Sequence, residues 1–222
     1  MIKLSPSTLN LFLECKRCFW LHINKNIHRP RGIFPSLPSG MDNVIKKYFD
    51  KYRLQKKLPP EIKGKVRGKL VEDMELLSKW RNWRTGLKYK DKKLDAVLSG
   101  ALDDCLIEKK LYIPLDYKTR GFPPKKGASE KYYQNQLDCY AFLLEKNGYP
   151  VQNFAYLIYY YPAEVQENGQ VNFNVQPIKI ETDPNRALKT FQDAISLLKS
   201  KIPPRHSNCE YCSWIGDVSG FD

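Results

Sequence analysis

The sequence predicts an α/β fold in which helices flank a mixed central sheet. Stretches with helical periodicity alternate along the chain with short apolar runs typical of strands. The apolar runs on both sides of Lys109-Lys110 predict a β-hairpin, and Asn168-Gly169 is a strong signal for a second one. A chain of 222 residues fits one large domain. We therefore expect residues 1–222 to form a single domain.

The N-terminal part of the chain predicts helices joined by loops. Ser5-Pro6-Ser7 has the serine caps and the early proline of a helix start. Apolar residues recur on one face of this helix and cysteines on another. The first face holds Leu9, Phe12, Leu13 and Phe19 or Trp20, and the second holds Leu11, Cys15, Cys18 and His22. The same signals then predict a loop at 29–40 and helices at 41–53 and 69–83.

The rest of the chain alternates strands with helices. A first strand at 94–98 leads into the central hairpin, and a basic loop at 121–127 follows that hairpin. The remaining expected elements are a helix at 129–147, strands at 153–161 and 170–180, and a helix at 184–201. This alternation favours helices packed on a mixed sheet.

The stretch Gly100–Thr119 predicts the functional site. A turn at Lys109-Lys110 places Asp103 opposite Asp116, because both residues are equally far from the centre of the turn. Opposed residues have Cβ atoms about 4.5–5.5 Å apart, so the two carboxylates can share one divalent cation. Lys118 points to the same side as Asp116, because strand side chains alternate between faces. Two acids and an ammonium are the groups of a metal-dependent phosphodiesterase.

Pro114 leaves one alternative open for this pairing. Proline cannot donate a hydrogen bond to a ladder, so its presence indicates a sheet edge or a bulge. A bulge would shift the register by one residue and could favour Asp104 over Asp103 at the site.

The acid-x-lysine spacing is common in this lysine-rich chain, where it occurs five times. Four of these occurrences suit ion pairs on a solvated surface. Only Asp116-Tyr117-Lys118 closes an apolar strand and has an acid on the partner strand. That context, and not the spacing, makes it the candidate site.

The charge of the chain indicates a polyanionic partner. There are 37 Lys and Arg residues against 24 Asp and Glu residues, so the formal net charge is +13. Between Lys46 and Lys93 the ratio is seventeen to six. Such a field attracts nucleic acid first, although a merely soluble basic surface remains the alternative.

The apolar segments of the chain are too short to cross a membrane. There is no run of about 18 apolar residues, and the first ten residues lack the apolar region of a signal peptide. We therefore expect a cytoplasmic protein with no membrane partner, in which thiols stay reduced.

Two Cys-x-x-Cys pairs form a second candidate site. Cys15 and Cys18 lie near the N-terminus, and Cys209 and Cys212 lie in the C-terminal tail. Four thiolates are what a zinc ion or a 4Fe–4S cluster requires, and the spacing alone does not choose between them. His22 and His206 are candidate substitute ligands or surface histidines, whereas Cys105 and Cys139 fit small core residues.

Three motifs in order resemble a known family. They are Gly100-x-x-Asp103, Asp116-Tyr117-Lys118-Thr119 and Gln136-x-x-x-Tyr140, the last with both side chains on one helical face. As a set they resemble the RecB-like branch of the PD-(D/E)XK nuclease superfamily. Ser5-Pro6-Ser7 followed by Glu14-Cys15 is similar to the start of its CRISPR-associated iron–sulfur exonucleases, the Cas-four type. The resemblance covers nearly the whole chain and implies a restriction-endonuclease-like fold.

The resemblance implies a metal-dependent DNA nuclease. It implies an exonuclease acting on single-stranded DNA or free ends, with partners in CRISPR adaptation or repair. Asp103 and Asp116 would hold Mg²⁺ or Mn²⁺, with the carbonyl of Tyr117 as a further ligand. Lys118 would orient water or neutralise charge developing on phosphorus. The glutamine and tyrosine of the third motif, Gln136 and Tyr140, would position the site or the nucleic-acid backbone.

One departure from the family pattern affects the metal site. The family usually carries a histidine ligand four residues after a glycine in an early helix. Here Gly40 is followed by Val44 at that position. Asp42 is the candidate replacement ligand, with a helix N-cap role as its alternative. The missing histidine motivates a second reading, in which the chain is a weakened or inactive nucleic-acid-binding module on the same fold.

The resemblance also gives the cysteines a role. The family takes one cluster cysteine from the N-terminus and three from the tail, whereas this tail holds two, Cys209 and Cys212. We infer that Cys18 joins Cys15 to replace the missing ligand. The resemblance favours a 4Fe–4S cluster, with zinc as the alternative. Such a centre would join segments 1–28 and 202–222 and close the chain ends on each other.

Overall fold

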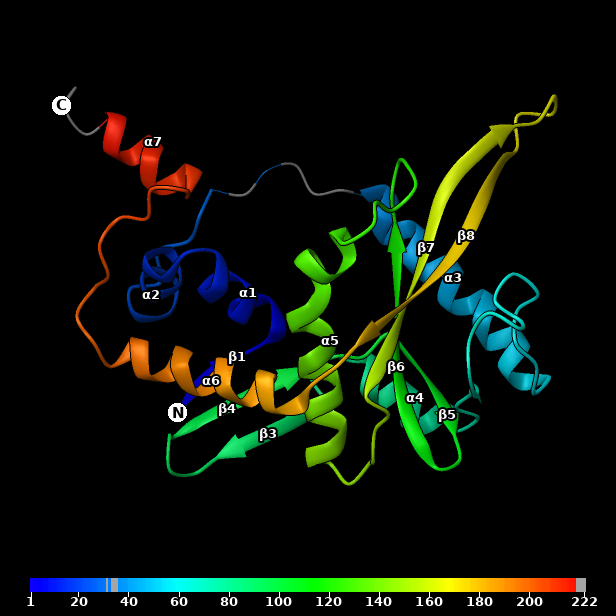
Figure 1. Cartoon of the computed structure of the whole chain (residues 1–222), viewed down its shortest axis with the longest axis horizontal. Coiled ribbons are helices and arrows are strands. Elements are labelled where there is room, and N and C mark those ends of the chain that lie inside the picture. The colour runs from blue at the N-terminus through cyan, green and yellow to red at the C-terminus, as the bar shows by residue number, and fades with distance from the viewer. Residues whose placement is uncertain (31, 33–35, 219–222) are drawn as a thin grey trace.

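The computed structural model describes residues 1–30, 32 and 36–218. Helix α5 (Ala128–Lys146) lies at the centre of the molecule and contacts strands of both of its sheets (Figure 1). The last four residues of the predicted 202–222 segment lie outside the described residues. The expected α/β architecture, a mixed sheet flanked by helices, is confirmed.

The larger sheet has five strands in the order β2-β5-β6-β7-β8. Its strands are β2 (Lys69–Leu70), β5 (Asp104–Glu108), β6 (Leu111–Thr119), β7 (Phe154–Val165) and β8 (Val171–Glu181). Strands β6 and β7 pair in parallel, while the other neighbours are antiparallel. The hairpin of β7 and β8 turns at the predicted Asn168-Gly169 and projects beyond the sheet (Figure 1).

A smaller sheet was not predicted. It has three strands in the order β1-β4-β3, namely β1 (Ile2–Leu4), β4 (Ala96–Gly100) and β3 (Leu87–Asp91). Strand β1 pairs in parallel with β4, which replaces the expected strand at 94–98. Gly100 ends β4 where α5 packs closely, since a Cβ at this position would lie 2.9 Å from Leu143 Cδ1.

Alternation along β7 divides the core between two faces of the five-stranded sheet. Phe154, Tyr156 and Ile158 pack on the side of α3 (Ser36–Leu54), together with Phe49 of that helix. The intervening residues of β7 pack on the side of α5 and α6 (Pro184–Leu198). The buried residues of β7 therefore face one of two covered layers, and the alternation decides which layer each side chain enters.

Three expected helices differ from the structure. The helix predicted at 41–53 begins earlier, at Ser36, so part of the predicted loop is helical and Asp42 is interior and not an N-cap. The helix predicted at 69–83 is wrong at its start, where β2 forms; α4 (Met74–Arg81) begins after Asp73, whose carboxylate accepts from Leu76 N at 2.9 Å. The first predicted helix is two helices, α1 (Pro6–Glu14) and α2 (Lys16–Asn24).

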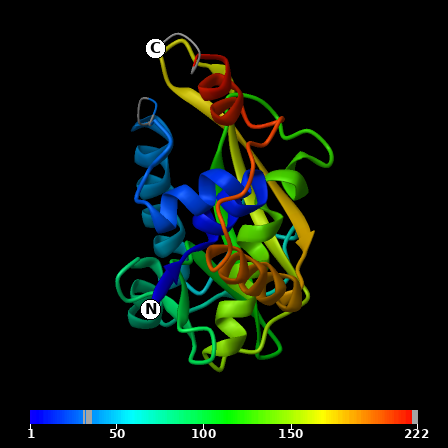
Figure 2. The ribbon, with the colours of Figure 1, turned by 90° about the vertical axis from the view of Figure 1, so that its left-hand side faces the viewer.

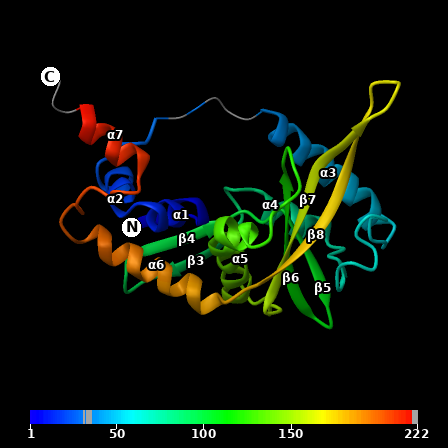
Figure 3. The ribbon, with the colours of Figure 1, turned by 45° about the horizontal axis from the view of Figure 1, so that its top comes forward.

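The two ends of the chain lie at the same end of the molecule. Figures 2 and 3 show α1 and α2 beside α6 and α7 (Glu210–Val218). Arg17 donates to the carbonyl of Pro203 at 2.8 Å, and Asn24 donates to that of Leu198 at 2.9 Å. These bonds fix the segment between α6 and α7 against α2. No helix among the described residues is long and apolar enough to cross a membrane.

Candidate active site and cysteine centre

The β5–β6 hairpin has the register that the sequence predicts. Lys109 and Lys110 have φ values of 48° and 69°, so both turn residues are in the left-handed region. Asp104 pairs with Leu115, and Pro114 pairs with Cys105 without a shift in register. Continuing the ladder by one residue places Asp103 across from Asp116, so the bulge that would have favoured Asp104 does not form.

Four of the predicted site residues meet on the α5 side of β6. Asp116 Oδ1 accepts a hydrogen bond from Gln136 Nε2 at 3.0 Å, and its buried Oδ2 forms an ion pair with Lys118. Gln136 Nε2 also donates to the Tyr140 hydroxyl at 2.7 Å. Lys118 Nζ donates to Gln136 Oε1 at 3.4 Å. The amide of Gln136 thus connects the acid, the ammonium and the tyrosine.

Burial and the neighbouring lysine act in opposite directions on the pKa of Asp116. Burial raises the pKa of Asp116 to about 7, and the nearby Asp103 carboxylate acts in the same direction. Lys118 opposes this shift through its charge and its hydrogen bond. Burial lowers the pKa of Lys118, but the charges of Asp116 and Asp103 outweigh burial and raise it overall. The ammonium therefore stays charged beside the acids.

Asp103 is held by a lysine that sequence reasoning missed. Lys46 of α3 donates to Asp103 Oδ1 at 2.8 Å and to Asp42 Oδ2 at 2.7 Å. Asp42, the candidate replacement ligand, therefore reaches Asp103 through this shared ammonium. Val44, at the position of the family histidine, is 63% exposed. The signal that was available is the i, i+4 spacing of Asp42 and Lys46 on a predicted helix.

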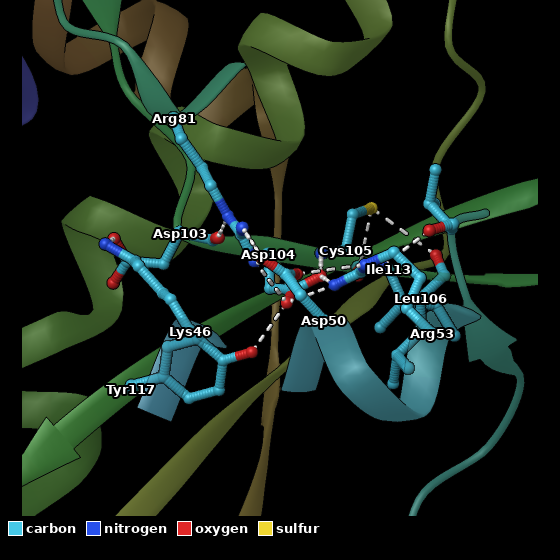
Figure 4. Close-up of polar contacts among 11 residues, drawn as sticks. Lys46, Asp50, Arg53, Arg81, Asp103, Asp104, Cys105, Leu106, Ile113 and Tyr117 are labelled. Atoms are coloured by element: carbon cyan, nitrogen blue, oxygen red, sulfur yellow. Dashed lines mark hydrogen bonds and ion pairs between the residues drawn. The ribbon is translucent and has the colours of Figure 1, made fainter. Parts of the chain in front are cut away.

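Asp104 points to the opposite face of the hairpin, into a buried ionic network (Figure 4). Its carboxylate accepts from Arg53, from Arg81 at 3.0 Å and from the Tyr117 hydroxyl at 2.6 Å. Arg81 Nε also donates to the backbone carbonyl of Asp103 at 2.8 Å. This network therefore holds the main chain at Asp103 in place from the face of the hairpin opposite to the acid centre. The side chain of Tyr117 faces this network, and its carbonyl as a metal ligand stays a prediction.

The donor set of the acid centre fits a hard divalent cation. Asp103 and Asp116 supply carboxylate oxygens, which Mg²⁺ and Mn²⁺ prefer. Asp116 Oδ2 is buried, and Lys118 is the described residue that reaches it. A cation would find this oxygen bound only by the Lys118 ion pair.

The four predicted cysteines meet at the ends of the chain. The Sγ atoms of Cys15, Cys18, Cys209 and Cys212 all lie within 4.8 Å of one another. Cys15 is both the C-cap of α1 and the N-cap of α2, and its sulfur accepts from Cys18 N at 3.4 Å. This group of described residues contains cysteines alone, so His22 and His206 are not part of it.

The cysteine sulfurs have the spacing of ligands to one ion. Cys15 Sγ lies 3.6 Å from Cys212 Sγ, and Cys18 Sγ lies 3.7 Å from Cys209 Sγ. A regular tetrahedron with Zn–S bonds of about 2.3 Å has edges of about 3.8 Å. Burial raises the pKa of Cys209, but hydrogen bonds from the Cys212 backbone and the neighbouring thiols outweigh burial and lower this pKa to about 7.

Two cavities lie along α5, and two residues of the acid centre line one of them. Gln136 and Tyr140 line a cavity of about 350 Å³, together with Asn10 and Trp83. A cavity of about 530 Å³ shares Asn10 and extends toward α6. Trp83 is 74% exposed and borders the first of these cavities, while Trp80, Tyr159 and Tyr160 are buried in the core.

Comparison with known proteins agrees with this geometry. A search of the curated proteins found no relative. The family model of the PD-(D/E)XK nuclease superfamily matches residues 36–216, a span that includes both acids, Lys118 and the motif on α5. Members of this superfamily are mostly metal-dependent nucleases. A match over most of the chain, with its acids and lysine on one hairpin, shows that the chain belongs to the PD-(D/E)XK nuclease superfamily.

Proposed function

We propose that the protein is a divalent-metal-dependent DNA nuclease whose catalytic centre is formed by Asp103, Asp116 and Lys118. The observation that carries the proposal is the meeting of a buried Asp116, its lysine and the α5 amide beside Asp103. When bound there, Mg²⁺ or Mn²⁺ supplies polarisation of the scissile phosphate and a bound water of lowered pKa.

The residues around the cation have separate tasks. Lys118 stabilises negative charge that develops on the phosphate, because its ammonium is fixed beside Asp116. Gln136 fixes the orientation of the Asp116 carboxylate and of Lys118 together. Tyr140 in turn holds the Gln136 amide. Asp42 and Asp103 both accept hydrogen bonds from Lys46, and Asp42 is the candidate third carboxylate ligand of the cation.

We further propose that the substrate is single-stranded DNA digested from a free end, as the family resemblance implies. The support is the cavity beside Gln136 and Tyr140, which has an exposed Trp83 on its border. Aromatic side chains stack on bases in a sequence-tolerant way. The excess of basic residues adds attraction for the backbone.

A cleavage assay tests both parts of this proposal. Wild type should degrade labelled linear single strands with Mn²⁺ and leave circular single strands intact. Asp116→Ala should lose the activity. Asp193→Ala should keep it, because Asp193 is exposed on α6 and forms an ion pair with nearby Lys189. Equal degradation by wild type and Asp116→Ala would reject the catalytic centre. Cleavage of circles would reject the exonuclease.

The four cysteines are proposed to hold a structural metal centre that joins the chain ends. The resemblance supports a 4Fe–4S cluster, in which each thiolate binds a different iron. The close approach of the four Sγ atoms, all within 4.8 Å of one another, also suits a single zinc ion. We propose the 4Fe–4S cluster, with zinc as the alternative.

Metal analysis of protein purified without oxygen decides between them. One zinc per chain in a colourless sample supports the tetrahedral ion. Four irons with visible absorbance that Cys15→Ala abolishes would establish the cluster. The cleavage assay is unaffected by this choice.

A second candidate function follows from Lys46. Its ammonium binds the Asp103 carboxylate that would otherwise be a metal ligand. This contact favours a nucleic-acid-binding module of the same fold that has lost its cleavage activity. Such a module binds DNA with steep salt dependence and gives no product with any divalent ion. Product formation that requires Mn²⁺ eliminates it.

A further inference from the structure

Lys46 forms a bridge between two carboxylates at the entrance to the acid centre. Its Nζ lies 2.7 Å from Asp42 Oδ2 and 2.8 Å from Asp103 Oδ1. Asp42 and Lys46 lie one turn apart on α3, whereas Asp103 comes from the chain just before β5. Figure 4 shows Lys46 ending beside Asp103, on the same helix as Asp50 and Arg53.

The three side chains of this bridge are partly buried. The Lys46 side chain is 21% exposed, and those of Asp42 and Asp103 are 35% and 24% exposed. The α3 helix that carries it is anchored by Arg53, whose fully buried guanidinium binds Asp104. Since Asp104 follows Asp103 in the chain, the spacing between Lys46 and Asp103 is fixed on both sides.

We infer that Lys46 competes with the divalent cation for Asp103 and Asp42. This inference rests on the proposed function, because it takes Asp103 to be a metal ligand. The ammonium is shared by the two carboxylates and balances one of their two negative charges. With a divalent cation held by Asp103, the ammonium would turn toward solvent and Asp42 would be available as a further carboxylate ligand. Lys46 is thus a positioning residue that sets the metal concentration at which the centre fills.

The size of the effect follows from competition between two occupants. An apparent dissociation constant equals the intrinsic one divided by the fraction of molecules that can bind. If the bridge is closed in roughly nine molecules of ten, removing it tightens cation binding about tenfold. Lys47 gives a matched control, because it neighbours Lys46 on α3, carries the same charge and is exposed.

Calorimetric titration of MnCl₂ into DNA-free protein tests the inference. Lys46→Met should bind Mn²⁺ about tenfold more tightly than wild type, while Lys47→Met should stay within about twofold. Lys46→Gln, which keeps a polar side chain of similar length, gives the same comparison if the methionine variant folds poorly. In Lys46→Met combined with Asp103→Asn, the tight binding should disappear.

The outcomes separate this inference from the proposed function. Equal or weaker Mn²⁺ binding by both Lys46 variants overturns the competition, and so does an equal gain in Lys47→Met. If wild type still cleaves DNA with Mn²⁺ in that case, the nuclease assignment stands without the inference. Absence of Mn²⁺ binding in every variant rejects both.

Discussion

The acid centre and the cysteine centre differ in how their charges are balanced. In the acid centre each carboxylate already has an ammonium, Lys46 on Asp103 and Lys118 on Asp116. The thiols of the cysteine centre contact mainly one another, with Arg29 donating to Cys209 Sγ at 3.5 Å. In the first centre each acid therefore has an ammonium partner from the chain itself, whereas the second centre gathers four thiols in an arrangement that suits a metal ion.

The two centres also differ in what holds their residues in place. The acids are placed by a hairpin with a short turn and by the alternation of a buried strand. The cysteine pairs that touch are separated by 197 and 191 positions along the chain. Metal should thus act on chemistry at the first centre and on stability at the second, because binding to a site that does not exist in the unfolded chain adds to the folding free energy.

Removing one cysteine ligand should have the largest effect on stability. Cys212→Ser deletes a thiolate that contacts both Cys15 and Cys18. We expect loss of the bound metal and a fall of more than about 4 kcal/mol in the free energy of unfolding. Urea unfolding measures the loss, and limited proteolysis should show early cleavage near the chain ends. If metal-loaded and metal-stripped wild type were equally stable, metal binding at the cysteine centre would not contribute to the folding free energy.

Substitutions of the adjacent acids Asp103 and Asp104 should have different effects, one on catalysis and the other on stability. Asp104→Asn removes the fully buried anionic partner of Arg53 and leaves only the ion pair of Arg53 with the partly exposed Asp50. Breaking a buried pair costs about 3–5 kcal/mol. Asp103→Asn changes a partly exposed acid and should cost less than about 1 kcal/mol, but it should abolish Mn²⁺-dependent cleavage. Urea midpoints and cleavage rates of the two variants check this. Similar losses of stability would mean that both acids belong to one network.

Sequence patterns predicted those parts of the site that depend on local rules. The turn at Lys109-Lys110 determines which residues are paired across the hairpin, and alternation then determines which of them face α5. The four-residue spacing of Gln136 and Tyr140 places both on one face of α5, where they meet Asp116. The four cysteines of the two Cys-x-x-Cys pairs were grouped by spacing and resemblance, and the structure brings these four together.

Other features depend on contacts between distant parts of the chain. The buried Arg53 and the partly buried Arg81 belong to a strongly basic stretch, which the charge pattern interprets as surface. Their partner Asp104 entered the prediction only as an alternative metal ligand. The parallel pairing of β1 with β4 joins residues 2–4 to 96–98, and no local periodicity encodes such a pairing. The bridge of Lys46 was missed for the same reason.

The Asp50 carboxylate should contribute to stability only above acidic pH. Burial raises the pKa of Asp50, but hydrogen bonds and charge from Arg81 and Arg53 outweigh burial and lower it below its usual value. Because the folded pKa is lower than that of the unfolded chain, about 3.9, the stabilisation is present above that pH. It is lost as pH falls through the folded pKa.

Asp50→Asn should therefore flatten the acid side of the stability profile. We expect a loss under about 1 kcal/mol at pH 7 and a smaller difference from wild type near pH 3, since Asp50 is partly exposed. Urea unfolding across this pH range measures the difference. Asp193→Asn on α6 is the exposed control and should follow wild type. If the stability difference between wild type and Asp50→Asn grew toward low pH, the folded pKa of Asp50 would not be lowered.

The smallest effect should come from Tyr140, which acts on the acid centre through Gln136. Tyr140→Phe removes one acceptor from Gln136 Nε2, while the bond of that nitrogen to Asp116 at 3.0 Å remains. One lost hydrogen bond is worth about 1 kcal/mol, so the cleavage rate should fall by about three- to tenfold. A loss above about a hundredfold would place the hydroxyl in contact with substrate. An unchanged rate would mean that Lys118 and Asp116 orient the amide unaided, and that the acid centre is fixed by charge alone.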